Sequence, residues 1–409
     1  MSTLSDPPTG SFQLSQLIND TRYRSYTFQF IALICLVAFI AYLLSNLIQN
    51  LAAAGLNISY EFLAEPAGYD INQRLIEYTS QSTHWRAAVV GVLNTLLVAV
   101  VGCFFATVIG VTVGVLRLSK NWLVARIMSI YVEIFRNVPV LIWILIIMAI
   151  FVAVLPQPRD FRGDDPAATM FLDLFAFTGR GFYLPRPYFA AEWAAGSTGW
   201  IVILVLLGAS FFSARALTAW ASKTQELTGN RPTTWYITLG IWFVPLIAAC
   251  IIMGLTWELP ALRGFNFQGG IFARNSFIAL TFALAIYTAA FIAENVRAGI
   301  MAISKGQTEA AASLGLRPNR IMNLVVLPQA LRVIIPPLIS QYLNLTKNSS
   351  LAIAVGYMDL TGTLGGITLN QTGRAIESIL LLMLFYLIIS LSISAIMNVY
   401  NNAVKLKER

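Results

Sequence analysis

Two pairs of opposite charges stand inside otherwise apolar stretches of this sequence. Glu133 and Arg136 are three residues apart, and Glu294 and Arg297 repeat that spacing. Side chains three apart lie on one helix face, so each couple could form a local ion pair near the end of its stretch. Alternatively, Glu294 could attract the ammonium group of a small zwitterion and Arg297 its carboxylate. Both interpretations stay open from the residues alone.

Other polar side chains also lie within or beside apolar runs. Asn94 and Thr95 near the start of one run are typical of helix packing, and could also line a polar path. A further group follows the Pro336-Pro337 pair, which together with Gly356 predicts a broken helix. Packing and a substrate route are equally consistent with that group, which consists of Asn344, Lys347, Asn348 and Ser349.

This sequence contains few residues that could catalyse a reaction or bind a metal ion. It contains one histidine, His84, and three cysteines without paired spacing, Cys35, Cys103 and Cys250. No G-x-x-x-x-G-K-S/T phosphate loop is found in the chain. We therefore expect neither an enzyme nor a resident cofactor or metal, and any nucleotide chemistry must come from another subunit.

The composition identifies the environment of these residues. Hydrophobic side chains make up 57% of the 409 residues and charged ones 11%. Runs of about 20 apolar residues, the length of a membrane-crossing helix, predict an all-α polytopic membrane protein. A β-barrel is disfavoured because its strands would alternate polar and apolar residues. We expect eight spans, at about 27–48, 88–116, 127–155, 199–222, 234–256, 276–300, 329–357 and 376–401.

Basic residues orient the chain. Lys120, Lys223, Lys305, Lys405 and Lys407 fall in the segments that are cytoplasmic when both termini are cytoplasmic, and no lysine falls in the outer segments. The net charge of +8 is thus better explained by topology than by nucleic-acid binding. The first run lacks a cleavage site and is expected to remain as a helix.

The spans suggest five regions. Residues 1–87 would hold a cytoplasmic tail, a first span and an outer segment, and 88–155 and 276–401 would hold five further spans. The insertion 156–275 would carry a long outer loop and two extra spans, and 402–409 a cytoplasmic tail. Aromatics in the outer loop are typical of headgroup anchors, and could also dock an external partner.

The segment 304–328 predicts a short cytoplasmic helix. Ser304 and Gln307 match a capping box at its start, and Glu309 is placed in its first turn, where it suits the helix dipole. Gly315 can end the helix in a left-handed conformation, and Pro318 is expected to block its continuation. The alanine run 310–312 would let another protein come close.

This segment resembles the EAA loop of binding-protein-dependent ABC importer permeases. The match consists of Glu309-Ala310-Ala311, Gly315, Val325 where isoleucine is usual, Leu327 and Pro328. Motifs of the polar amino-acid permease subfamily surround it, with Asn137 where glycine is common and Asn348-Ser349-Ser350 where Asp-Thr-Ser is common. The extra spans are similar to those of the first permease subunit of alphaproteobacterial general L-amino-acid importers. The motifs are Gly91-Val92-Leu93-Asn94-Thr95, Tyr131 to Pro139, Ala293 to Gly299 and Lys347 to Leu351.

The resemblance implies a type I ABC importer fold in the bacterial inner membrane, with 88–155 and 276–401 as the permease core and 304–328 as its coupling loop. It implies a homologous second permease subunit, two ATP-binding cassette subunits that hold ATP and Mg, a periplasmic amino-acid-binding protein, an L-amino acid substrate and surrounding membrane lipid. Coupling to the ATPase would use Ser304, Gln307, Glu309, Ala310, Ala311, Gly315, Leu327 and Pro328. The alternative is an ion-coupled carrier, which needs titratable carboxylates near mid-membrane. Glu133 and Glu294 lie inside predicted spans, each beside an arginine.

Overall fold

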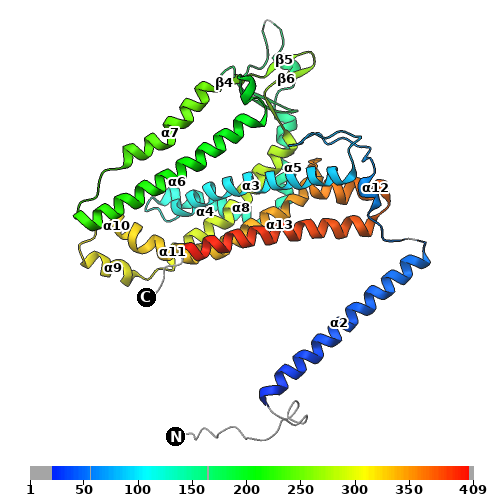
Figure 1. Ribbon diagram of the computed structural model, residues 1–409, viewed down its shortest axis with the longest axis horizontal. Coiled ribbons are helices and arrows are strands. Elements are labelled where there is room, and N and C mark those ends of the chain that lie inside the picture. The colour runs from blue at the N-terminus through cyan, green and yellow to red at the C-terminus, as the bar shows by residue number, and fades with distance from the viewer. Residues whose placement is uncertain (1–20, 56, 164, 405–409) are drawn as a thin grey trace. The chain divides into compact units, whose positions relative to one another are not determined.

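The computed structural model describes residues 21–55, 57–163 and 165–404 (Figure 1). It divides into two units, residues 1–63 and 64–409, which are described separately. The expected cytoplasmic tails lie largely outside the described residues. In the first unit, helix α2 (Thr21–Ala53) is apolar and exposed along nearly all of its described length. Its length and composition suit a membrane span.

Eight helices in the described part of the chain are long and apolar enough to cross a membrane, as predicted. In the second unit they are α3 (His84–Leu116), α5 (Val140–Val154), α6 (Ser197–Thr228), α7 (Trp235–Ile252), α8 (Asn275–Met301), α11 (Leu327–Asn348) with its flanking turns, and α13 (Ala375–Val404). The third predicted span, 127–155, is wrong as one continuous helix. It is divided into α4 (Trp122–Asn137) and α5, because Val138 precedes Pro139 and adopts an extended conformation.

Helix α8 forms the centre of the second unit. Helices α3, α4, α5 and α11 all pack against it, and its small and branched residues are buried on most sides. The approach of α3 to α8 is close because α3 carries glycines there. A Cβ at Gly110 would lie 2.6 Å from the Cβ of Ile292, and one at Gly114 2.8 Å from the carbonyl oxygen of Ala293. Small residues at such a crossing are typical of membrane helix pairs.

The seventh span is more continuous than predicted. Helix α10 (Pro318–Ile321), a π-helical turn (Met322–Val326) and α11 follow one another directly. Pro336 and Pro337 lie inside α11 and do not break it, so that part of the prediction is wrong. The break comes later, where a 3₁₀ turn (Ser349–Val355) ends at Gly356 with φ +68°. A π-helical segment (Thr361–Thr368) and α12 (Leu369–Thr372) then lead to α13.

The insertion contains strands that the all-α prediction did not include. Outside a membrane the backbone can pair with itself in a sheet, and this outer segment is rich in aromatic residues that favour strands. The strands form three small antiparallel sheets: β1 (Ala176–Thr178), β2 (Gly181–Leu184) and β7 (Ile271–Arg274); β3 (Arg186–Phe189) and β4 (Leu255–Glu258); and β5 (Ala261–Arg263) and β6 (Asn266–Gln268).

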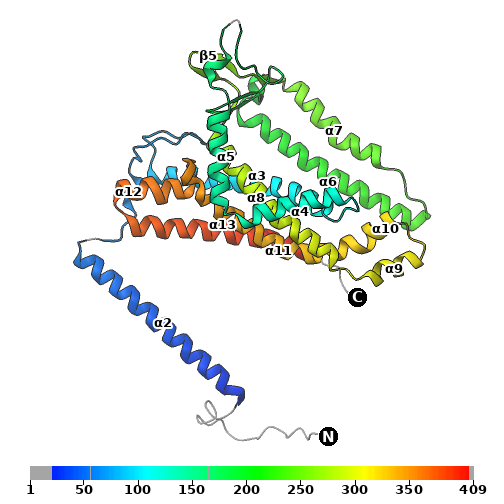
Figure 2. The same cartoon turned by 180° about the vertical axis from the view of Figure 1, so that it is seen from behind.

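Helices α6 and α7 pack against one another as a hairpin that starts and ends at these sheets (Figure 2). The strand pair β3–β4 connects one end of each helix, because β3 precedes α6 and β4 follows α7. Short 3₁₀ turns lie at Glu61–Ala64, Pro158–Phe161 and Glu192–Ala194. The strands β1 to β7 form a small outer domain at one end of the hairpin (Figure 1).

Candidate functional site

The short cytoplasmic helix is α9 (Lys305–Ser313), which follows α8 after a brief turn. Ser304 is its N-cap residue, but the predicted capping box is wrong because the Ser304 side chain makes no capping hydrogen bond. Only the backbone N–H of Gln307 donates to the Ser304 carbonyl, at 3.1 Å. Glu309 lies beyond the first turn, so the prediction that it suits the dipole there is also wrong.

The other end of α9 is built as predicted. Gly315 adopts φ +76°, and its N–H donates to the carbonyl of Ala312 at 2.9 Å. The N–H of Leu316 donates to the carbonyl of Ala311 at 3.4 Å. These two bonds form the Schellman pattern that fixes a helix end. Pro318 begins α10 and does not stop the chain from being helical, because proline fits the first helical position.

Helix α9 presents two different faces. Ala311 is buried in a small apolar cluster with Ile321 and Val326, against which Ile300, Ile303, Leu316 and Val325 pack. Ala310 and Ala312 are exposed, and Leu314 at the helix end is 81% exposed. Gln307 and Glu309 are exposed as well. The inner face is thus anchored to this chain, while the outer face of small and apolar residues has room for another protein.

Leu327 and Pro328 lie at the start of α11, behind the π-helical turn. Proline costs no hydrogen bond in the first turn of a helix. Leu327 is exposed, and Pro328 is half-buried. The structure therefore places the whole EAA-like segment between α8 and α11, with Val326 as its contact to α9.

A charge cluster surrounds Glu294 near the cytoplasmic end of α8. Its carboxylate lies 3.1 Å from Arg297 of the same helix, which confirms that predicted pair. It also lies 2.5 Å from Arg117 at the end of α3 and 3.7 Å from Arg136 of α4. Three guanidinium groups thus share one carboxylate, which leaves two positive charges in excess. The cluster ties three helices together and makes this end of the bundle positive.

The predicted pair between Glu133 and Arg136 is wrong. Glu133 is exposed and forms no ion pair with any residue that the structure describes. Arg136 turns to Glu294 and also lies over the ring of Phe291, 5.4 Å from its centroid. The two Glu-Arg couples have the same three-residue spacing. Only the second forms a pair within its helix, because the packing of α4 on α8 brings Arg136 to Glu294.

Asn94 and Thr95 hold α3 to the segment that follows Gly356. The amide of Asn94 donates to the carbonyls of Gln73 and Met358, each at 2.8 Å. The hydroxyl of Thr95 accepts from the N–H of Leu360 at 3.1 Å. Both residues are fully buried. These contacts are those of helix packing, and a role in the path stays a prediction.

The polar group at the end of α11 is divided between two environments. Asn344 and Lys347, one turn apart, are exposed on the same face of the helix. Ser349 is buried and its hydroxyl donates to the carbonyl of Thr346 at 2.8 Å, while Asn348 is half-buried. An amide and an ammonium on an open face of a membrane helix need a polar neighbour, because lipid would leave them unsolvated.

Two residues that make buried polar contacts, Arg117 and Asp359, were not predicted from the sequence. Arg117 stands directly after the predicted span 88–116, and this position at the end of an apolar run could have drawn attention to it. Asp359 follows the seventh span and is fully buried. Its carboxylate accepts from the N–H of Gly362 at 2.9 Å and from the hydroxyl of Tyr386 at 3.1 Å. It connects the segment after Gly356 to α13.

Burial raises the pKa of Asp359 to about 7, although the hydrogen bonds from Gly362 and Tyr386 oppose the shift. An unfolded aspartate titrates at about 3.9. Between these values the unfolded chain releases a proton that the folded chain keeps, so stability should fall as pH rises from about 4 to about 7. Below this window both states are protonated, and above it the loss is complete.

We therefore expect Asp359→Asn to raise the thermal stability of the purified protein at pH 8 and to leave it nearly unchanged at pH 4.5. Asparagine keeps an acceptor for Gly362 and removes the charge. Melting curves at the two pH values measure this. The exposed Asp165 supplies the control Asp165→Asn, which should show no such pH-dependent gain. An equal gain at both pH values would contradict the buried acid.

This chain is similar to a known protein family and to several characterised transport proteins. The family model of the binding-protein-dependent transport system inner membrane component matches residues 230–406. The chain is 54% identical to the glutamate/glutamine/aspartate/asparagine transport system permease protein BztB of Rhodobacter capsulatus, over 100% of both chains. It is 43% identical to the general L-amino acid transport system permease protein AapQ of Rhizobium johnstonii, over 95% of this chain and 94% of that one.

A third relative is the putative amino-acid ABC transporter permease protein YhdX of Escherichia coli. It is 43% identical over 94% of this chain and 95% of its own. Among solved structures, an amino acid ABC transporter crystallised with histidines matches with a TM-score of 0.44 and 18% identity, covering 78% of this chain and 95% of that one.

Proposed function

We propose, because this chain belongs to the family of binding-protein-dependent transport system inner membrane components, that it forms the membrane path of an ATP-driven importer of L-amino acids. The observation that carries this proposal is similarity over the full length to relatives that are named as amino-acid permeases. The eight membrane helices agree with a multi-pass protein of the bacterial inner membrane. Glu294 is held by arginines and Glu133 is exposed, so these two carboxylates do not favour the ion-coupled carrier.

The outer face of α9 is the contact that we assign to the ATPase. Ala310 and Ala312 allow a close backbone approach, and Leu314 offers an apolar side chain that would be covered there. ATP and Mg would be bound by that partner, and its closure would push on α9. Because the Schellman end at Gly315 and the buried Ala311 fix α9 to α8 and α11, a push on α9 would move both membrane helices.

The remaining partners are a homologous second permease subunit, a second ATPase subunit and a periplasmic amino-acid-binding protein. The exposed face of α11 with Asn344 and Lys347 supports a second subunit. A lysine that faced lipid would cost roughly 2.5–3.5 kcal/mol at mid-bilayer, so this face should meet protein or a water-filled path. The excess positive charge around Glu294 would lie at the inner end of that path and favour carboxylate groups.

Loss of the ATPase from the purified complex tests the assignment of α9. Leu314→Glu places a charge in the proposed contact, and we expect at least a tenfold drop in co-purifying ATPase, about 1.4 kcal/mol of binding free energy. Leu227 is a matched control, since it is 79% exposed at the cytoplasmic end of α6 and lies far from α9 in the chain. Quantitative mass spectrometry of the affinity-purified complex measures the ratio of subunits.

We expect Leu227→Glu to leave the subunit ratio as in the wild type. The isolated wild-type chain should also hydrolyse no ATP. An unchanged ATPase content in Leu314→Glu, or ATP hydrolysis by the isolated chain, would contradict the proposal.

A further inference from the structure

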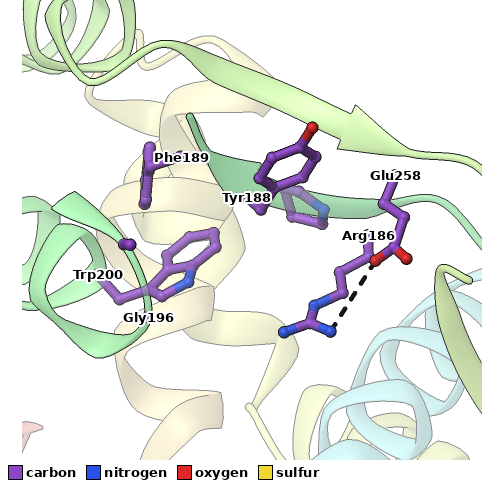
Figure 3. Close-up of a pocket in the computed structure, with 8 residues that line it drawn as sticks. Arg186, Tyr188, Phe189, Gly196, Trp200 and Glu258 are labelled. Atoms are coloured by element: carbon purple, nitrogen blue, oxygen red, sulfur yellow. Dashed lines mark ion pairs between the residues drawn. The ribbon is translucent and has the colours of Figure 1, made fainter. Parts of the chain in front are cut away.

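A cavity of about 460 Å³ lies on the outer domain of the insertion, where the β3–β4 strand pair meets the start of α6 (Figure 3). Small-molecule sites typically measure roughly 300–1,000 Å³. The cavity is separate from the charge cluster around Glu294 and from α9, because its walls come from the insertion alone. The residues that line it include Arg186, Tyr188, Phe189, Gly196, Trp200 and Glu258.

The charged side of the cavity is made by Arg186 and Glu258. These residues face each other across the β3–β4 pair, and Arg186 Nη1 lies 3.9 Å from a carboxylate oxygen of Glu258. The Arg186 side chain is 62% exposed and the Glu258 side chain is 46% exposed. Neither side chain makes a hydrogen bond within the described part of the chain. The pair is therefore loose, and most donors of Arg186 and acceptors of Glu258 are available to a ligand.

The opposite side of the cavity is aromatic. Figure 3 shows Trp200 and Phe189 across from Arg186 and Glu258, with the ring of Tyr188 between the two groups. Phe189 is buried and lies 5.1 Å from Trp200 between ring centroids. Trp200 and Tyr188 are 43% and 44% exposed, so their surfaces are open to the cavity and solvent. Aromatic rings attract cations as well as apolar groups.

Packing fixes the aromatic side of the cavity. A Cβ at Gly199 would lie 2.3 Å from Phe189 Cδ2, so only glycine lets the start of α6 approach that ring. Gly196 has φ +67° and begins the turn into α6. Because α6 begins at Ser197 and is long and apolar enough to cross a membrane, the cavity lies at one end of a candidate membrane helix.

We propose that this cavity binds a zwitterionic group with an anion at Arg186, an ammonium at Glu258 and the carbon chain between them against Trp200 and Tyr188. A guanidinium recognises carboxylates and phosphates, and a carboxylate recognises an ammonium group. Two sources share this chemistry: a free L-amino acid from the periplasm, and the phosphoethanolamine headgroup of phosphatidylethanolamine. The inference does not depend on the proposed function, since it concerns binding to the outer domain and not transport.

Binding to the assembled transporter tests the proposal in two arms. In the first arm the complex is reconstituted, without its binding protein, in nanodiscs of phosphatidylglycerol, and equilibrium binding of tritiated L-glutamine is measured. In the second arm native mass spectrometry measures phosphatidylethanolamine retained by the complex after extraction from membranes that contain both lipids. The variants are Arg186→Gln and Glu258→Gln, with Arg263→Gln as the control because Arg263 is exposed on β5 outside the cavity.

We expect both cavity variants to weaken binding by about tenfold or more in one arm, since each removes a charge-assisted contact. The arm that responds identifies the source, amino acid or lipid headgroup. Trp200→Ala leaves the strand pair intact and should weaken binding in the same arm, so the test survives misfolding of a strand variant. Wild-type binding by all three cavity variants in both arms, or an equal loss in Arg263→Gln, would overturn the proposal.

Discussion

Replacing Glu294 by glutamine is expected to abolish uptake and to lower the yield of assembled transporter. The change leaves Arg117, Arg136 and Arg297 close together without their shared carboxylate. Arg117 is only 10% exposed, so water cannot take over fully. Removing one partner from such a partly buried group should destabilise the fold by roughly 2–4 kcal/mol. Thermal unfolding and uptake by the purified, reconstituted complex measure the two effects.

Glu133→Gln is the matched control for this prediction. Glu133 is also a glutamate within an apolar region and also lies three residues before an arginine, but it is exposed and forms no ion pair among the described residues. We expect its stability to stay within about 0.5 kcal/mol of the wild type, as for a surface site. Equal behaviour of the two variants would show that the charge cluster does not stabilise the helix bundle.

The charge exchange Glu294→Arg with Arg297→Glu separates local from long-range pairing. A pair confined to one helix would tolerate the exchange, because such pairs contribute only about 0.2–0.5 kcal/mol. In this structure the new arginine would meet Arg117 and Arg136 from α3 and α4. We therefore expect the exchanged protein to be as unstable as Glu294→Gln, so loss of uptake alone would not identify a substrate contact.

Replacing Gly315 by valine is expected to uncouple ATP hydrolysis from uptake while the complex still assembles. A Cβ at Gly315 would meet nothing within 4 Å, so space is not the constraint. The constraint is φ +76°, which costs an L residue roughly 1–2 kcal/mol, and more for a β-branched side chain. The Schellman end should open and α9 should no longer move together with α8 and α11.

Gly306→Val is the control for this prediction. A Cβ at Gly306 also meets nothing within 4 Å, but Gly306 lies inside α9 with ordinary helical geometry. Valine there should keep or slightly improve the helix. Uptake and ATP hydrolysis stimulated by the binding protein are measured in proteoliposomes for both variants. Normal coupling in Gly315→Val would mean that the fixed end of α9 is not needed to transmit movement.

The sequence predicted features that depend on local rules. Membrane helices follow from the length of apolar runs, and the end of α9 follows from the freedom of Gly315 to take a positive φ. Two predictions from local rules were wrong: the side-chain capping box at the start of α9 and the helix break at the proline pair. Ser304 caps α9 through its backbone alone. Pro336 and Pro337 are exposed and stay within α11, directly after the buried residues Ile334 and Ile335.

Contacts between distant segments could not be predicted from one sequence. Arg117 and Glu294 are 177 residues apart, and only the packing of α3 on α8 brings them together. Asp359 was missed because its burial comes from α13, which supplies Tyr386. The strands of the insertion were missed because each is only three or four residues long, too short for an alternation of polar and apolar residues to be recognised. The spacing of charged residues along the sequence thus identifies candidate site residues, and the packing of the helices determines which of them come into contact.

The wild-type protein in the same proteoliposome assay tests the central claim most directly. The complex of this chain with its co-purified partners is reconstituted with the binding protein outside, and uptake of radiolabelled L-amino acids is measured with ATP or a non-hydrolysable analogue enclosed. The account predicts uptake that requires ATP hydrolysis and persists when ionophores remove the proton and sodium gradients. Uptake that continues with the analogue and stops when those gradients are removed would contradict it and identify an ion-coupled carrier.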